Sequence, residues 1–128
     1  ADFDIGRAYV VATLIATVVA APVVEELVFR GVVMRGFLSR LGPVVTIGLQ
    51  AVLFGLAHAD PVRGAGNIGL VIALSGVGAV FGGAAFLLRR LGVTVMAHAY
   101  FNGITMLLLL TGWLEDLQRD LGSLIGAG

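Results

Sequence analysis

Four long apolar stretches, separated by turn signals, set the organisation of this chain. Helices rich in Ala, Val, Leu, Ile, Gly and Phe are expected over residues 8–40, 43–58, 67–91 and 93–111. The breaks between them are Leu41-Gly42-Pro43, the Pro- and Gly-containing loop 59–66, and Gly92. About 20 apolar residues cross a bilayer as a helix. The pattern therefore predicts an all-α, polytopic membrane helical bundle with about four transmembrane helices.

The stretches differ in length and packing signals. At helical rise, residues 8–40 would extend about 50 Å, beyond the roughly 30 Å hydrocarbon core, so we expect tilt, a kink at Pro22 or a protruding end. Gly78 and Gly82 form a GxxxG spacing, which indicates close helix packing. Residues 113–128, beginning with Trp113, alternate apolar and charged positions and predict an amphipathic interfacial tail. The chain thus divides into a core, 1–112, and a tail, 113–128.

Composition supports the membrane assignment and removes several classes of function. Hydrophobic residues make up 59% of the chain and charged residues 12%, against about a quarter charged in soluble domains. The formal net charge is zero and no basic run suggests nucleic acid. Without cysteine there is no disulfide, thiolate nucleophile or thiolate metal site. The chain starts without Met, and we expect it to be the core of a larger protein.

The arginines predict an orientation. Four of them, Arg35, Arg40, Arg89 and Arg90, flank the turns expected at 41–43 and 91–92, whereas the 59–66 loop carries Arg63. The positive-inside rule places those two turns in the cytoplasm. The Lys-free, Arg-, Gly- and Ala-rich composition favours the plasma membrane of a prokaryote.

A small set of polar residues interrupts the apolar stretches: Glu25, Glu26, Arg30, Gln50, His58, His98 and Asn102. Ionisable groups inside a membrane segment are costly and indicate a functional site. Glu26 and Arg30 are one helical turn apart, with the acid first, which favours an ion pair. Glu25 is then the carboxylate without a local partner, and it suits a general base.

Histidine and asparagine offer partners for that base. His98 and Asn102 share one helix face, and His58 ends the second predicted helix. Glu25 lies 15 residues before Arg40 and His58 lies 15 residues after Pro43, so their depths agree. His98 follows Gly92 by only 6 residues. On this count His98 is too shallow to meet Glu25, unless its helix starts deeper, its turn dips inward or the helices tilt strongly.

These residues carry a resemblance to a known family. The chain resembles the CPBP intramembrane proteases, the CAAX prenyl endopeptidase and bacteriocin-processing (Abi) family, in three ordered motifs: Glu25-Glu26-x-x-x-Arg30, Phe54-x-x-x-His58 and His98-x-x-x-Asn102. The resemblance implies an intramembrane endopeptidase that cleaves membrane-tethered or prenylated peptides. It implies that Glu25, helped by His58, activates water, that His98 and Asn102 stabilise the oxyanion, and that Glu26 and Arg30 brace the site.

Two further questions stay open at this point. The family is often described as metalloproteases, and Glu25, His58 and His98 could form a zinc set. The zinc-protease motif HExxH is absent, since His58 is followed by Ala-Asp-Pro, and a metal-free glutamate mechanism without cofactor is favoured. The same polar set could also serve proton-coupled transport or a non-catalytic bacteriocin-immunity or scaffold protein.

Overall fold

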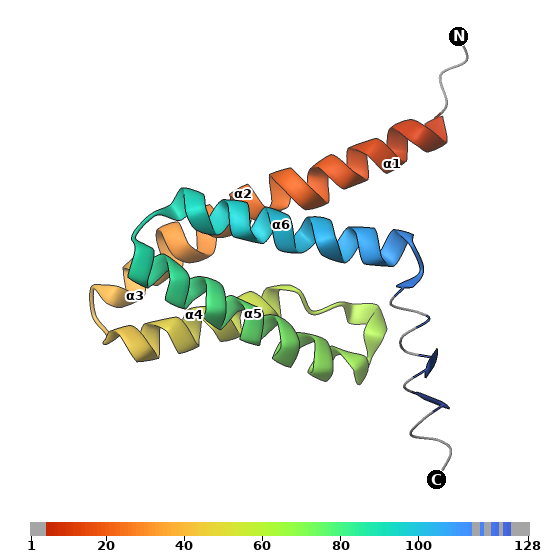
Figure 1. Cartoon of the computed structure of the whole chain (residues 1–128). Helices are drawn as coiled ribbons and strands as arrows, with labels where there is room; N and C mark the ends of the chain where they lie inside the picture. The colour runs from red at the N-terminus through yellow and green to blue at the C-terminus, as the bar shows by residue number, and fades with distance from the viewer. Residues whose placement is uncertain (1–4, 114–115, 117–118, 121, 124–128) are drawn as a thin grey trace. The chain divides into compact units, whose positions relative to one another are not determined.

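The computed structural model describes residues 5–113, 116, 119–120 and 122–123, and every element in this part of the chain is helical (Figure 1). The helical residues up to Leu110 agree with the predicted all-α class. The predicted amphipathic tail, 113–128, falls largely outside the described residues.

The first apolar stretch is helical from Ile5 to Leu38, with two wider π-helical turns within it. Its segments are α1 (Ile5–Ile15), η1 (Ala16–Ala20), α2 (Ala21–Glu26), η2 (Leu27–Val33) and α3 (Met34–Leu38). Proline has no N–H and its ring clashes with the carbonyl of residue i−4. The π turn η1 directly precedes Pro22, so the wider turn gives this ring its room. The second π turn, η2, follows the two glutamates and contains Arg30.

The second helix, α4 (Pro43–Ala57), starts and ends close to the predicted positions. Gly42 is extended at the N-cap and Pro43 takes the first helical position, where its missing N–H costs nothing. After His58 the loop contains a short 3₁₀ turn, η3 (Pro61–Arg63), capped by the Asp60 side chain, which accepts from the Val62 N–H at 2.9 Å. Asn67 bonds both backbone polar groups of Asp60 and ties the loop to the next helix.

The last two helices are α5 (Gly66–Leu88) and α6 (Leu91–Leu110). The predicted break at 91–92 is wrong: α5 ends before Arg89, and Gly92 lies inside α6. Arg89 takes the left-handed conformation, with φ 52° and ψ 25°, and this ends α5. The sequence assigned that role to a glycine, because glycine takes this conformation without steric cost.

Three helical stretches are long and apolar enough to cross a membrane: Gly6–Leu38, Gly66–Leu88 and Leu91–Leu110. The second predicted span, 43–58, corresponds to α4, which is apolar but has 15 residues, about 22 Å of helix. Many large apolar side chains on these helices are exposed, Val44 at 85% and Ile72 at 67% among them. Such a surface fits lipid rather than water, and the chain is an integral membrane protein.

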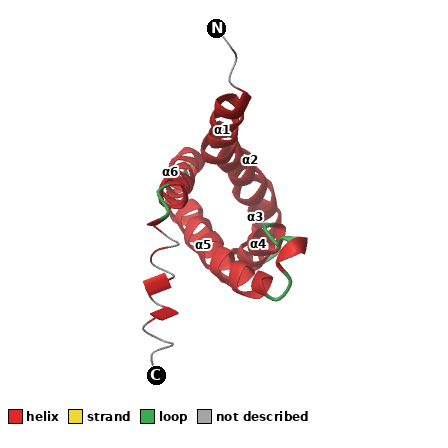
Figure 2. Cartoon of the chain, turned by 90° about the vertical axis from the view of Figure 1, so that its right-hand side faces the viewer, coloured by secondary structure: helices red, strands yellow, loops and turns green. Residues whose placement is uncertain are grey.

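The described chain separates into two compact units. One comprises residues 23–98 and the other 1–22 with 99–128. Within the first, α4 and α5 lie side by side along their length (Figures 1 and 2). In the second, the Asn102 amide donates to the Thr17 carbonyl at 2.9 Å, and Gly103 faces Val18.

The interior of the unit formed by residues 23–98 is unusually polar. Its buried apolar residues are few, with Phe54 the most enclosed at 1% exposure. The buried polar ones are Glu26, Arg30, Thr46, Gln50, Thr94 and His98. Burial of charge requires pairing and hydrogen bonding, so this interior indicates a site rather than a passive core.

The α4–α5 contact requires a glycine at position 55. A Cβ built there would lie 3.0 Å from the Ser75 backbone nitrogen and would also meet the Val71 carbonyl. We expect Gly55→Val to force these helices apart and to lower stability by about 1–3 kcal/mol. Thermal unfolding of the purified protein in detergent measures this. Gly48 on the same helix has nothing within 4 Å of its built Cβ. Equal unfolding temperatures for Gly48→Val and Gly55→Val would contradict the packing argument.

Candidate active site

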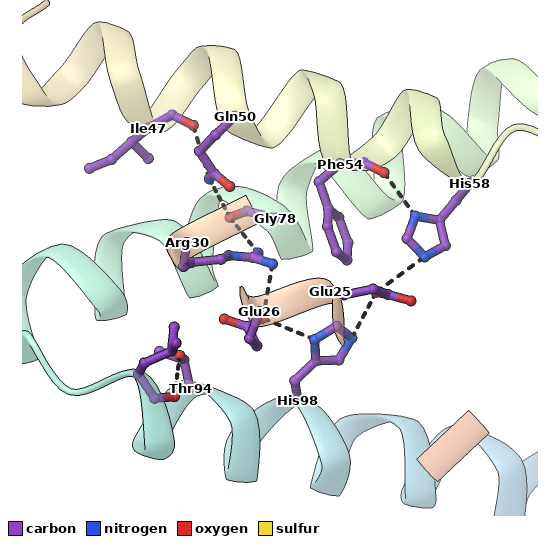
Figure 3. A network of polar contacts seen from close by, with 11 residues as sticks. Glu25, Glu26, Arg30, Ile47, Gln50, Phe54, His58, Gly78, Thr94 and His98 are labelled. Carbon is purple, nitrogen blue, oxygen red and sulfur yellow. Dashed lines mark hydrogen bonds and ion pairs between the residues drawn. The ribbon is translucent and has the colours of Figure 1, made fainter. Parts of the chain in front are cut away.

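The site begins with a buried ion pair on the first helical stretch. Arg30 Nη1 lies 2.9 Å from Glu26 Oε1, and both side chains are fully enclosed. Arg30 Nη2 also donates to the Gly78 carbonyl at 3.2 Å, and Gln50 Nε2 donates to the same oxygen at 2.8 Å. The pair that the spacing predicted is therefore present, and it is fastened to α4 and α5 (Figure 3).

Aromatic rings enclose the arginine. The guanidinium carbon of Arg30 lies 4.6 Å from the centre of the Phe54 ring and 5.6 Å from that of Phe81. The face of an aromatic ring attracts a cation, most strongly where water is absent. The same two rings contact His98, with centroid distances of 5.7 Å and 5.0 Å. Phe54 and Phe81 thus hold Arg30 and His98 in fixed positions.

His98 reaches the glutamates, contrary to the depth count from Gly92. Its Nδ1 lies 2.9 Å from Glu26 Oε1, and its Nε2 lies 3.6 Å from Glu25 Oε2 (Figure 3). The reason is the level at which α6 begins. A Cβ built on Gly31 would lie 3.9 Å from Leu91 Cδ2, so the first residue of α6 lies beside Gly31 rather than beside Arg40. Of the explanations left open by the sequence, the deeper start of the fourth helix is the one observed.

Three acceptor atoms meet at Glu25. His58 Nδ1 is 2.8 Å from the Phe54 carbonyl, and His98 Nδ1 faces the Glu26 carboxylate. Because these oxygens only accept, each Nδ1 is the donor of its contact, and whenever a ring is neutral its Nε2 presents a lone pair. The two Nε2 atoms lie 3.5 Å and 3.6 Å from Glu25 Oε2. That oxygen is buried and has no hydrogen-bond partner among the described residues. Such an arrangement suits a water molecule, which brings two donor hydrogens.

His58 lies past the end of α4 and outside the three candidate spans. The neighbouring Glu25 carboxylate stabilises the protonated ring and thereby raises the pKa of His58, while burial opposes this. The side chains of His58 and Glu25 keep 31% and 23% exposure, against 3% for His98. The Glu25–His58 side of the cluster is therefore its more exposed side.

Asn102 belongs to the unit formed by 1–22 and 99–128. It follows His98 by one turn on α6 and is half-buried. One of the two amide hydrogens is engaged by the Thr17 carbonyl.

The cluster contains side chains of the kinds that bind zinc. Glu25, His58 and His98 are suitable ligand types. Among the described residues, however, no three His, Cys, Asp or Glu side chains are arranged to hold a metal ion. The side chains as arranged do not fit zinc.

Some residues of the site could not be assigned a role from the sequence. Gln50 stood out as a polar residue in an apolar stretch, but nothing in its spacing showed that it shares the Gly78 carbonyl with Arg30. Phe81 carries no signal at all, because phenylalanine in an apolar helix is ordinary. Glu26 was expected to pair with Arg30 alone, and its bond to His98 joins residues 72 apart. A buried histidine requires an acceptor, which was the one available hint.

A family of known proteins matches most of this chain. No curated protein and no solved structure matches the chain. Residues 7–104 match the family described as type II CAAX prenyl endopeptidase Rce1-like. This range includes every residue of the cluster and Asn102, and it covers well over half of the chain. The chain therefore belongs to the Rce1-like family of type II CAAX prenyl endopeptidases.

Proposed function

We propose that this chain is an intramembrane endopeptidase in which Glu25 activates the attacking water. One observation carries the proposal: Nε2 of His58 and Nε2 of His98 both face the same buried oxygen, Glu25 Oε2. A water donating to that oxygen and to one imidazole is oriented at two points. The family membership gives the reaction class, and the cluster supplies a base and its supports.

The reaction then follows from the roles of the side chains. Glu25 takes a proton from water as the water oxygen bonds to the scissile carbonyl carbon. The tetrahedral intermediate collapses with cleavage of the C–N bond, and the same carboxyl returns the proton to the leaving amine. His58, fixed through Nδ1 to the Phe54 carbonyl, orients the water. The products are a new carboxylate and a new amine.

Charge on the substrate oxygen requires donors, which we assign to His98 and Asn102. His98 is suited to this because it is almost fully buried and because Glu26, which accepts from its Nδ1, fixes the orientation of the ring. Donors placed in advance, away from water, stabilise an oxyanion most effectively. Glu26 and Arg30 act by positioning His98 and do not touch the substrate.

The substrate class follows from the family and the surroundings of the site. We propose a membrane-tethered peptide, prenylated as in CAAX proteins. The apolar exposed faces of the helices let such a lipid anchor approach through the bilayer. The partly exposed Glu25–His58 side then receives the peptide bond.

Cleavage of a fluorescent farnesylated peptide by the protein in detergent tests both activity and metal dependence. We expect hydrolysis to continue within about twofold after dialysis against 1,10-phenanthroline, since Glu25 rather than a metal ion activates the water. Loss of activity that only added zinc restores would overturn the metal-free mechanism. Complete lack of cleavage, with farnesylated and unmodified tethered peptides alike, would contradict the proposed activity and favour the scaffold alternative.

A further inference from the structure

A second cavity lies apart from the Glu25–His58 side. It has a volume of about 330 Å³ and is lined by two kinds of side chain. The basic ones are Arg30, Arg35 and Arg89, and the apolar ones are Met34, Leu38, Ala85, Phe86 and Leu91. All belong to the unit formed by residues 23–98.

The cavity lies at the start of α6. Leu91, the first residue of α6, lies beside Gly31 and lines the cavity together with residues of the segment 32–38. Arg35 and Leu38 lie on this segment. The candidate spans Gly6–Leu38 and Gly66–Leu88 both end next to the cavity. The ends of membrane spans lie at the level of lipid headgroups.

The cavity has cationic groups but no carboxylate in its lining. Within the described part of the chain, neither Arg35 nor Arg89 forms an ion pair with a carboxylate. Arg30 is only 3% exposed, and its Nε is buried without a hydrogen-bond partner among the described residues. Arg30 is thus the enclosed cation of the lining, and Arg35 and Arg89 are the exposed ones that an anion can reach.

Arg89 supports the same conclusion through its backbone. It is the one residue other than glycine with a positive φ among the described residues. An arginine in the left-handed region costs about 1 kcal/mol relative to glycine. Positive charge at the end of a membrane span is general, and the neighbouring Arg90 supplies it without backbone strain. The strained position is the one whose side chain lines the cavity.

We propose that this cavity binds the phosphate group of an anionic phospholipid. Arginine guanidinium groups suit phosphate oxygens in geometry and charge. Met34, Leu38 and Phe86 then contact the upper part of an acyl chain. A free phosphate ion has no apolar part that could contact these side chains. Arg30 joins the two sites, since its Nη1 pairs with the same Glu26 oxygen that accepts from His98.

Direct lipid binding tests the inference without any cleavage assay. The delipidated protein in detergent is titrated with phosphatidylglycerol, phosphatidylcholine or sodium phosphate, and bound lipid is counted by native mass spectrometry. We expect one phosphatidylglycerol to bind with clear preference over phosphatidylcholine. Arg89→Gly keeps the backbone conformation, because glycine adopts it freely, and should weaken this binding about tenfold through loss of a charge-assisted contact. Arg35→Gln, at an exposed position, should weaken it similarly.

Arg90→Gln is the matched control, because Arg90 is adjacent and exposed but does not line the cavity. We expect it to change the affinity by less than about twofold. Equal weakening by Arg89→Gly and Arg90→Gln would overturn the site in favour of diffuse attraction between basic turns and anionic lipid. Competition by sodium phosphate at the concentrations at which phosphatidylglycerol binds would overturn the assignment to lipid.

Discussion

Replacing Glu25 with glutamine is expected to lower kcat/KM for cleavage of a farnesylated peptide by about 10²- to 10⁴-fold, the range of general-base catalysis. Glutamine keeps the size of the side chain and removes its ability to take a proton. Its carboxamide also places a donor where Oε2 faced the two Nε2 atoms, at 3.5 Å and 3.6 Å. Substrate binding is retained, so the loss should fall on kcat rather than on KM.

Folding separates this effect from a structural one. The Glu25 side chain keeps 23% exposure and forms no buried ion pair with an arginine, so Glu25→Gln should unfold within about 1 kcal/mol of wild type. A matched control is Val24→Ala, which changes the neighbouring, exposed side chain. Wild-type cleavage by Glu25→Gln would show that the base lies elsewhere. Loss of folding together with activity would contradict the division between Glu25 and Glu26.

Much of the fold could be predicted because membrane helices are apolar over their whole length. The break at Gly42-Pro43 was placed correctly, since proline and glycine punctuate a helix locally. The break at 89–90 was misplaced because a left-handed arginine, unlike a glycine, gives no sequence signal. The misplaced break changed the depth expected for His98. Counting from a shared level for both turns made His98 too shallow, whereas the level of α6 is set by the contact of Leu91 with Gly31.

The sequence predicted which residues form the site better than it predicted the contacts between them. The spacing of four residues predicted the ion pair between Glu26 and Arg30, and the structure contains it. Connections between helices are different, because they depend on which faces meet. Two examples are contacts of this kind. Glu26 bonds to His98, and the Gly78 carbonyl accepts from both Arg30 and Gln50. The GxxxG spacing predicted close packing at Gly78, and the buried carbonyl of this residue accepts from both donors.

The buried pair of Glu26 and Arg30 leads to the second large effect. Arg30→Met is expected to lower the stability of the protein by about 3–5 kcal/mol, because it leaves the fully enclosed Glu26 carboxylate without its cation. Methionine also removes the donor to the Gly78 carbonyl and the charge between Phe54 and Phe81. Unfolding by denaturant in detergent micelles, followed by tryptophan fluorescence and circular dichroism, measures the loss.

A double variant distinguishes stability from catalysis at the same position. Glu26→Leu with Arg30→Met removes both buried charges, and replacement of a buried pair by apolar side chains is often neutral or stabilising. We therefore expect the double variant to recover most of the stability that Arg30→Met loses, while cleavage stays at least about 10²-fold below wild type. The reason is that Nδ1 of His98 loses the Glu26 acceptor that fixes its ring and tautomer. Recovery of activity along with stability would show that the pair only maintains the fold, and that His98 needs no anchor at Glu26.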